Sequence, residues 1–320
     1  MAYFGRRAGL IWLCVLTLHA PAAYAGWDGE TVSLTLENDA TVSSDRHYTQ
    51  GSFLSYLSRD DALVHWTKVV SDNLPTFGYN VRAMKWGVGF GQEIYTPENL
   101  QSTELQVDDR PYAGWLFGRF TLQRRGELTP RWWILENFHL DLGVIGPESQ
   151  AEDTQKVWHG KDPQGWQHQL KTEPGFELRY ERRFYYDAFN SPDGWGLQVI
   201  PHVGGGAGNI ATLLNAGGTL RLGYNLPNEA AVRPNDLKWG AYFLAGVDGR
   251  FVLHNIFLDG NTWHFSHRVN KRPFVGDARV GLGLSLKNVE LTFAQVIRSR
   301  EFNDQKTADS FGSATLSVKF

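Results

Sequence analysis

The sequence has almost no cysteine: the 320-residue chain contains one, Cys14. This residue lies inside an apolar N-terminal segment, and no small residues of a lipoprotein cleavage site immediately precede it. If the segment is removed on export, the remaining protein has no thiol. Disulfides, thiolate zinc sites and cysteine nucleophiles are then excluded.

The sequence also lacks an apolar run long enough for a transmembrane helix. The run from Leu10 to Leu18 falls short of the roughly 20 residues that cross a bilayer. Two arginines precede it, and small residues follow it at Ala23-Tyr24-Ala25. This arrangement predicts a cleaved export signal over residues 1–25 and a mature chain over residues 26–320.

Strong net charge and a familiar serine motif are absent as well. The formal net charge is −3 and no basic patch stands out, which argues against a nucleic-acid partner. No G-x-S-x-G sequence is present, so a serine on a nucleophile elbow is not expected. No composition shift typical of a linker divides the chain, which favours a single domain.

Aromatic residues and glycine are abundant instead. The chain contains 12 Trp, 12 Tyr, 19 Phe and 34 Gly, yet its mean hydropathy is −0.35. A polar average with many aromatic residues is typical of a membrane β-barrel. In such a barrel half of each strand faces a polar lumen, and aromatic belts mark both interfaces.

Alternation of apolar and polar residues indicates the strands. Near the C-terminus Val280, Leu282, Leu284 and Leu286 alternate with small or polar residues, and the last segment ends on an apolar-face residue, Phe320. Successive side chains of a strand point to opposite faces, so one face of each segment suits lipid. A terminal Phe on an amphipathic strand resembles the signal recognised by the bacterial barrel assembly machinery.

Twelve such segments can be placed along the chain. An even number suits an all-β, antiparallel transmembrane β-barrel with both chain ends in the periplasm. A soluble β-sandwich is the alternative, but the long alternation over 238–258 would overhang a sandwich. The predicted strands are residues 30–38, 48–59, 84–94, 112–124, 131–144, 174–187, 194–206, 215–225, 238–258, 272–287, 289–300 and 310–320.

Strand parity assigns each connection to one side of the membrane. If the first strand ascends from the periplasm, the connection 145–173 is extracellular and 60–83 is a long periplasmic one. Apolar residues at helical spacing predict an amphipathic helix within 60–83, capped by Asp60 or Asp61. We expect this helix to pack under the barrel or to lie on the inner face of the membrane.

Three polar clusters that are far apart in sequence fall at the extracellular rim under this topology. Their convergence at one rim is typical of a functional site. The clusters are Glu37-Asn38-Asp39 with Asp45-Arg46-His47-Tyr48-Thr49, Gln92-Glu93-Ile94-Tyr95-Thr96 with Asp108-Asp109-Arg110, and Gly143 to Pro147 with Gln155 and His159.

Several of these segments, in this order, resemble the lipid A 3′-O-deacylase (LpxR) family. The most specific are Leu36-Glu37-Asn38-Asp39, Tyr48-Thr49-Gln50-Gly51 and Asp141-Leu142-Gly143-Val144-Ile145-Gly146-Pro147, followed by Gln155 and His159. The resemblance implies a twelve-stranded outer-membrane barrel, calcium dependence and removal of the 3′-linked acyloxyacyl group from lipid A. It also implies a catalytic site at Asn38, Asp39, Thr49, Gln155 and His159.

The chemistry of ester hydrolysis suits these residue types. Hydrolysis needs a base for water and a cation or donor for the oxyanion. His159 is the natural base, because an unperturbed imidazole has a pKa of about 6.5. Asp39 and Asn38 offer hard oxygens as calcium ligands. Thr49 and Gln155 are suited to orient water or to donate to the oxyanion.

The site residues also have ordinary structural interpretations. Asn38-Asp39 is a common turn-forming pair. Parity points Asn38 toward lipid, so it contributes only if the pleat breaks there. We expect Tyr112, Trp115 and Trp166 in the interfacial aromatic girdle rather than against a substrate. The four-residue gap between Gln155 and His159 predicts a short helix in the loop that holds them.

Binding of the lipid head group calls for cations. The outer loop 101–109 contains acidic residues but no Lys or Arg. Two interpretations stay open: the preferred lipid A has a different core, or the head group is bound by cations elsewhere, with Arg46, Arg110, Lys156, Lys161 and Lys171 as the candidates. The acyl chain stays in the outer leaflet, which favours a groove on the outer wall, formed in part by Ala113 and Gly114.

The sequence features predict an outer-membrane barrel with a site that faces the cell exterior. The resemblance implies that it is an enzyme acting on lipopolysaccharide with calcium as cofactor. Two alternatives of other classes stay open. The first is an outer-membrane phospholipase or a deacylase of another position. The second is a small porin or structural barrel without enzymatic activity.

Overall fold

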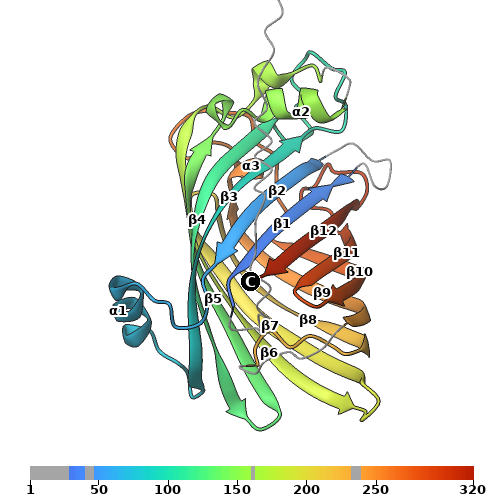
Figure 1. Ribbon diagram of the computed structural model, residues 1–320. Coiled ribbons are helices and arrows are strands. Elements are labelled where there is room, and N and C mark those ends of the chain that lie inside the picture. Colours follow the sequence, from blue (N-terminus) through green and yellow to red (C-terminus); the bar gives the residue numbers. More distant parts are fainter. Residues whose placement is uncertain (1–28, 40–46, 160–162, 232–238) are drawn as a thin grey trace, which may run out of the picture.

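The computed structural model describes residues 29–39, 47–159, 163–231 and 239–320, without the side chains of Trp158 and His159. The predicted export signal lies outside these residues. Within them, twelve antiparallel strands form one closed barrel in which β1 closes on β12 (Figure 1). The strands are β1 (Thr31–Asn38), β2 (His47–Leu57), β3 (Asn80–Thr96), β4 (Ala113–Thr129), β5 (Trp132–Ile145), β6 (Glu173–Asn190), β7 (Trp195–Gly208), β8 (Ala211–Tyr224), β9 (Trp239–Asn255), β10 (Phe274–Leu286), β11 (Val289–Arg298) and β12 (Asp309–Lys319).

The closed barrel confirms the predicted all-β architecture. Each of the twelve predicted segments overlaps one observed strand. The apolar stripe of β10 faces outward, where Leu282 and Leu284 are 61% and 57% exposed. Closure pairs the two edge strands with each other. A membrane protein needs this pairing, because the bilayer core contains no water to form hydrogen bonds with unpaired backbone groups.

Charged side chains, rather than an apolar core, occupy the lumen. They line a cavity of about 830 Å³. Glu229, in the connection after β8, accepts a hydrogen bond of 2.9 Å from Arg221. Asp277 of β10 binds Arg250 at 2.8 Å and Arg298 at 3.1 Å, and so links three neighbouring strands. A polar interior with an apolar exterior is the pattern of a membrane barrel.

Short helices lie in the connections at both ends of the barrel. α1 (His65–Asn73) follows β2, and α2 (Ala151–His159) follows β5 after the turn η2 (Pro147–Ser149). Two shorter turns are η3 (Trp166–His168) and α3 (Ile256–Asp259). Figure 1 shows α2 above one end of the barrel and α1 beside the wall toward the other end. In the described part of the chain, every helix is too short or too polar to cross a membrane.

The predicted cap of the periplasmic helix is wrong, although the helix itself exists. α1 begins after Val64, which has an extended backbone and makes no side-chain cap hydrogen bond. Asp60 instead binds Arg125 and lies 3.7 Å from the Lys85 ammonium. Charge-assisted hydrogen bonds of this kind are stronger than neutral ones, so the lumen cations hold the carboxylate away from the helix terminus.

Candidate active site

One extra residue in β2 turns Thr49 away from the lumen. The register between β2 and β3 shifts between Tyr48 and Gln50, which makes Thr49 the extra residue of a β-bulge. Tyr48 donates its hydroxyl to Glu37, a lumen-lining residue, at 2.6 Å. Thr49 Oγ1 instead lies 2.7 Å from Thr96 Oγ1, and both side chains are buried. Regular alternation from Gly51, which pairs with Glu37, would point Thr49 into the lumen, so the bulge reverses the direction of the residues that precede Gln50.

A row of residues on the outer wall leads from Asn38 toward helix α2. Asn38 of β1 pairs with Gln50 of β2. Gln50 pairs with Ile94 of β3, and Ile94 pairs with Gly114 of β4. Cross-strand neighbours lie about 5 Å apart, so the row spans roughly 15 Å.

The outward direction of Asn38 does not exclude it from the site, contrary to the expectation from parity. Its neighbour Glu37 lines the lumen, so the pleat continues unbroken through β1 and Asn38 faces outward. The pleat does not need to break, because the helix that carries Gln155 packs against the outside of the wall.

Gly114 of β4 lies against the first residue of α2, Ala151, and against Ser149 of η2. A Cβ at this position would lie 2.1 Å from Ser149 Oγ and 2.2 Å from Ala151 Cβ, so only glycine fits. Gln92, two residues before Ile94 on the same face of β3, donates to the Ser149 carbonyl at 2.7 Å. Gly114 is thus a docking contact rather than part of the open groove expected at this position.

Gln155 is held in one orientation by Trp166. Its Oε1 accepts a hydrogen bond of 2.9 Å from the indole Nε1, and both side chains are buried. An indole N–H only donates, so the amide atom that faces it must be the oxygen. Gln155 Nε2 is buried and makes no hydrogen bond to any described residue. Among the described residues, the Gln155 amide therefore has two buried N–H donors without an acceptor.

The predicted helix around His159 is confirmed. Gln155 and His159 both belong to α2, where a separation of four residues puts the two positions about one turn apart. The side chain of His159 lies outside the described part of the structure, as does Arg46. Lys156 is partly exposed on the helix surface, with its ammonium 2.7 Å from Glu152.

Asp39 directly follows β1 and is 1% exposed. Its carboxylate and the Asn38 amide oxygen are hard donors, which is the ligand type that calcium prefers. Among the described residues, no group of three or more His, Cys, Asp or Glu is arranged to hold a metal ion. The two residues therefore fit calcium in kind but not in number, since calcium takes about six to eight oxygens and the others must come from backbone, water or substrate.

Arg110 forms a buried ion pair rather than an open phosphate site. It is fully buried, its Nη2 donates to Glu301 Oε2 at 2.7 Å, and its Nη1 donates to the His47 carbonyl at 3.3 Å. Burial alone would raise the pKa of Glu301, but the nearby guanidinium groups, Arg110 first, lower it to about 2. Head-group binding by Arg110 stays a prediction that this geometry does not favour.

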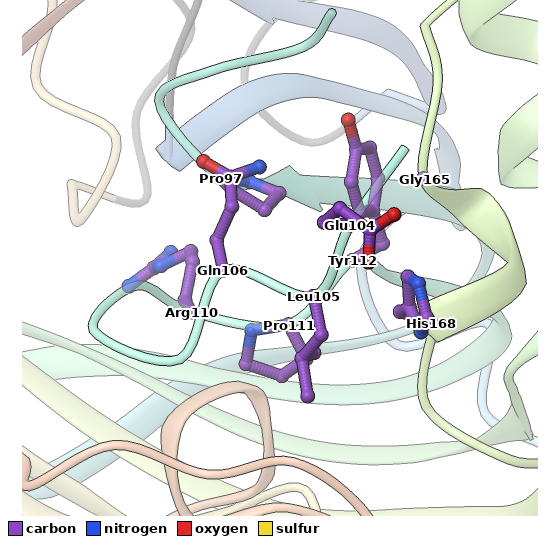
Figure 2. Close-up of a pocket in the computed structure, with 9 residues that line it drawn as sticks. All are labelled: Pro97, Glu104, Leu105, Gln106, Arg110, Pro111, Tyr112, Gly165 and His168. Carbon is purple, nitrogen blue, oxygen red and sulfur yellow. The ribbon is translucent and has the colours of Figure 1, made fainter. Parts of the chain in front are cut away.

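A small cleft lies beside Arg110, between the 97–112 connection and η3 (Figure 2). Figure 2 shows Arg110 and His168 on opposite sides of it. Its volume of about 10 Å³ is room for roughly one water molecule, so it does not hold an acyl chain. The lining residues are Pro97, Glu104, Leu105, Gln106, Arg110, Pro111, Tyr112, Gly165 and His168.

The assignment of Tyr112, Trp115 and Trp166 to the interfacial girdle is wrong. They are only 2%, 1% and 2% exposed. Tyr112 and Trp166 pack together at 4.9 Å in the cluster beneath α2, and that cluster includes Ile94 of the outer wall. Girdle positions are instead occupied by residues such as Tyr224 and Trp239, which stack at 4.7 Å at the other end of the barrel.

Comparisons with known proteins place this architecture among outer-membrane barrels. The family model described as outer membrane protein LpxR matches residues 10–320. Among solved structures, LpxR from Salmonella typhimurium is similar with a TM-score of 0.70 and 20% sequence identity, over 91% of this chain and 100% of that one. The β-domain of the Bordetella autotransporter Brka is similar with a TM-score of 0.52 and 10% identity, over 92% and 100%. Curated protein sequences yield no match. At these identities the structural likeness shows the fold alone.

Proposed function

The chain belongs to the LpxR family of outer-membrane lipid A 3′-O-deacylases, and from this premise we propose that His159 and calcium carry the reaction. The family makes the protein an ester hydrolase of the outer membrane. The proposed reaction is hydrolysis of the 3′-linked acyloxyacyl ester of lipid A in the outer leaflet. The residue assignment is supported mainly by the geometry of the Gln155 amide. This amide is buried and oriented by Trp166, and its two N–H donors have no acceptor among the described residues.

In the proposed mechanism His159 is the general base. Its imidazole takes a proton from water, and the hydroxide attacks the ester carbonyl carbon. The tetrahedral intermediate then collapses, and the imidazolium returns the proton to the sugar oxygen that leaves. An imidazole is suited to both steps near neutral pH, because its ordinary pKa is about 6.5.

Gln155 is proposed as the donor to the oxyanion of this intermediate. Its Nε2 lies on the same helix as His159 and one turn away, so base and donor are carried by one rigid element. A donor that is fixed before the reaction stabilises the developing charge without reorganisation. Thr49 is proposed to position the substrate or the attacking water from the outer wall.

Asp39 and Asn38 would hold the calcium ion. When bound, calcium supplies a Lewis acid that polarises the ester carbonyl. The burial of Asp39 and the outward direction of Asn38 support this role, since Asn38 begins the outer-wall row and Asp39 follows it directly.

The position of the site suits a lipid substrate. Asn38, Gln50 and the base of α2 lie on the outer surface of the barrel, so lipid A reaches them sideways from the leaflet and its acyl chain need not enter the charged lumen. Lys156, whose side chain is partly exposed on α2, is proposed to bind the head group. Arg46 is proposed for the same role.

Mass spectrometry of hexa-acylated lipid A after incubation with the purified protein and calcium tests the mechanism. We expect wild type to remove the 3′-acyloxyacyl group, and His159→Ala to lose at least about 100-fold of the rate, as expected for a general base. His168→Ala is the matched control, because His168 lies in the same connection and its ring forms a hydrogen bond with the Thr103 carbonyl. Undiminished cleavage by His159→Ala would contradict the assignment, and release of fatty acid from glycerophospholipid would indicate a phospholipase instead.

A further inference from the structure

Three charged residues line up on the lipid-facing side of the wall. Arg124 of β4 pairs in register with Glu136 of β5, and Glu136 pairs with Arg182 of β6. Their chain neighbours Arg125 and Asn137 line the lumen, so this triad faces outward. Charged side chains on the lipid face of a membrane barrel are destabilising. Yet the three are only 1%, 0% and 7% exposed, so protein covers them.

The cover is the end of α1 and the segment that follows it. Arg124 and Arg182 donate to backbone carbonyls of this segment, and a tyrosine hydroxyl of the segment donates to Glu136. These bonds fix the segment to the outside of the barrel. They run from Arg124 to Ser71 (3.2 Å), Leu74 (3.1 Å) and Pro75 (2.8 Å), from Arg182 to Thr76 (3.0 Å), and from Tyr79 to Glu136 (2.6 Å).

α1 presents two different faces besides the one that docks on the wall. Its docked face is formed by Thr67 and Ser71, which are buried. One free face is apolar, with Trp66, Val69 and Val70 52%, 47% and 45% exposed. The other free face carries the polar residues His65, Lys68 and Asp72, of which the last two form an exposed ion pair at 2.7 Å.

The apolar face of α1 continues the lipid-facing surface of the barrel. The ring of Trp66 packs at 4.6 Å against Phe120 of β4. Phe120 is an even-numbered residue of β4, like Arg124, and therefore lies on the outer wall, whereas Gln123 and Arg125 line the lumen. Trp66 thus extends the apolar outer face of the wall onto α1, which Figure 1 shows beside the barrel.

We propose that residues 64–79 form an arm whose helix α1 is inserted in the inner leaflet of the outer membrane. The arm is docked on the wall by the Arg124, Glu136 and Arg182 triad. The occupant of its apolar face is the acyl region of inner-leaflet glycerophospholipids, while the face of Lys68 and Asp72 meets the head groups and water. An arrangement with one polar and one apolar face is that of an interfacial helix. The protein thereby contacts the inner leaflet through a dedicated helix.

Site-directed spin labelling of the full-length protein in phosphatidylethanolamine–phosphatidylglycerol vesicles tests this proposal. With Cys14→Ser, which removes the chain's only cysteine, Val69→Cys and Lys68→Cys each give one labelled site on adjacent residues of α1. Collisions of the label with oxygen, which concentrates in lipid, are compared with collisions with a polar nickel complex. Leu284→Cys, on the exposed wall of β10, provides the lipid reference.

We expect oxygen to dominate at position 69, as at position 284, and the nickel complex to dominate at position 68. Equal access of the nickel complex to positions 68 and 69 would overturn the proposal, because α1 would then lie in the periplasm. Docking is tested separately by adding Glu136→Gln to the Val69→Cys variant. The label should become more mobile at position 69 and not at position 284. An unchanged spectrum at position 69 in that background would contradict docking by the triad.

Discussion

Thr49 and Gln155 each owe their direction to one buried neighbour. The Thr96 hydroxyl lies 2.7 Å from that of Thr49, and the Trp166 indole holds the oxygen of the Gln155 amide. Both contacts are removed from water, so they fix the groups before any substrate arrives. In the proposed site, both residues are therefore preorganised.

The Trp166 contact predicts a positioning effect on the reaction. Trp166→Phe keeps a ring against Tyr112 but removes the N–H that orients Gln155, so we expect kcat to fall about 10- to 100-fold with little change in KM. Deacylation kinetics measure both constants. In a Gln155→Ala background the same substitution should have no further effect on kcat, and additive losses in the double variant would argue against the proposed link.

The Arg110–Glu301 pair predicts an acid-sensitive contribution to stability. The folded-state pKa of Glu301 is lowered from 4.5 to about 2. The pair therefore stabilises the fold fully above about pH 4.5, and this contribution is lost as the pH falls toward 2. Glu301→Gln leaves a buried guanidinium uncompensated and should lower the free energy of unfolding by about 3 kcal/mol at pH 7.

Denaturant unfolding in detergent at pH 7 and pH 3 measures this difference. Lys306→Gln is the control, because its pair with Glu98 is exposed and should contribute about 1 kcal/mol or less. The loss caused by Glu301→Gln should shrink at pH 3. A loss of the same size at both pH values would show that the carboxylate does not act through its charge.

At the scale of elements, the site depends on the contact between α2 and the wall. The strand β4 offers a glycine where η2 and α2 approach it most closely, and Gln92 of β3 holds the Ser149 carbonyl. Because α2 carries both Gln155 and His159, any shift of the helix moves the proposed donor and base together.

Gly114→Val should separate α2 from the wall and reduce deacylation by about 100-fold while the barrel stays folded. The matched control is Gly118→Val, four residues along the same face of β4, where an added Cβ would come no closer than 3.9 Å to any atom. Deacylation rates measure activity, and heat-modifiable electrophoretic mobility shows whether the barrel is folded. Equal activity of the two variants would mean that the position of α2 does not matter.

The strands and α2 were predictable from the sequence because their signals are local. Alternation marks strands such as β10, and a four-residue spacing marks the turn from Gln155 to His159. The bulge at Thr49 was not predictable, because it appears only in the register with β3. The predicted cap of α1 was wrong for the same reason, because Asp60 binds Arg125 and Lys85, which belong to other strands.

At the scale of the whole molecule, the proposed chemistry lies on the outside of the barrel. Ion pairs such as Arg221 with Glu229 line the lumen. Asn38 and the base of α2 lie instead on the outer side of the barrel wall. An enzyme built in this way meets its lipid without extracting it from the leaflet. The arm at the other end gives the same barrel a contact with the inner leaflet.

The convergence of the candidate residues at one rim followed from strand parity alone. The side of the wall that the proposed site occupies was not predictable, because it depends on where α2 packs. Strand parity alone had argued against Asn38. The burial of Arg110 was also hidden, since its partner Glu301 is 191 residues away in sequence. Local sequence pattern thus identified the residues at the rim, while their contacts required the closed barrel.

The measurement that tests the account most directly is the mass of lipid A after incubation with wild-type protein, with calcium and with a chelator. With calcium, tandem mass spectrometry should show loss of the acyloxyacyl group from the 3′ position. The chelator should abolish this loss, and added calcium should restore it. An unchanged lipid A mass with calcium, or equal cleavage in the presence of the chelator, would contradict the account.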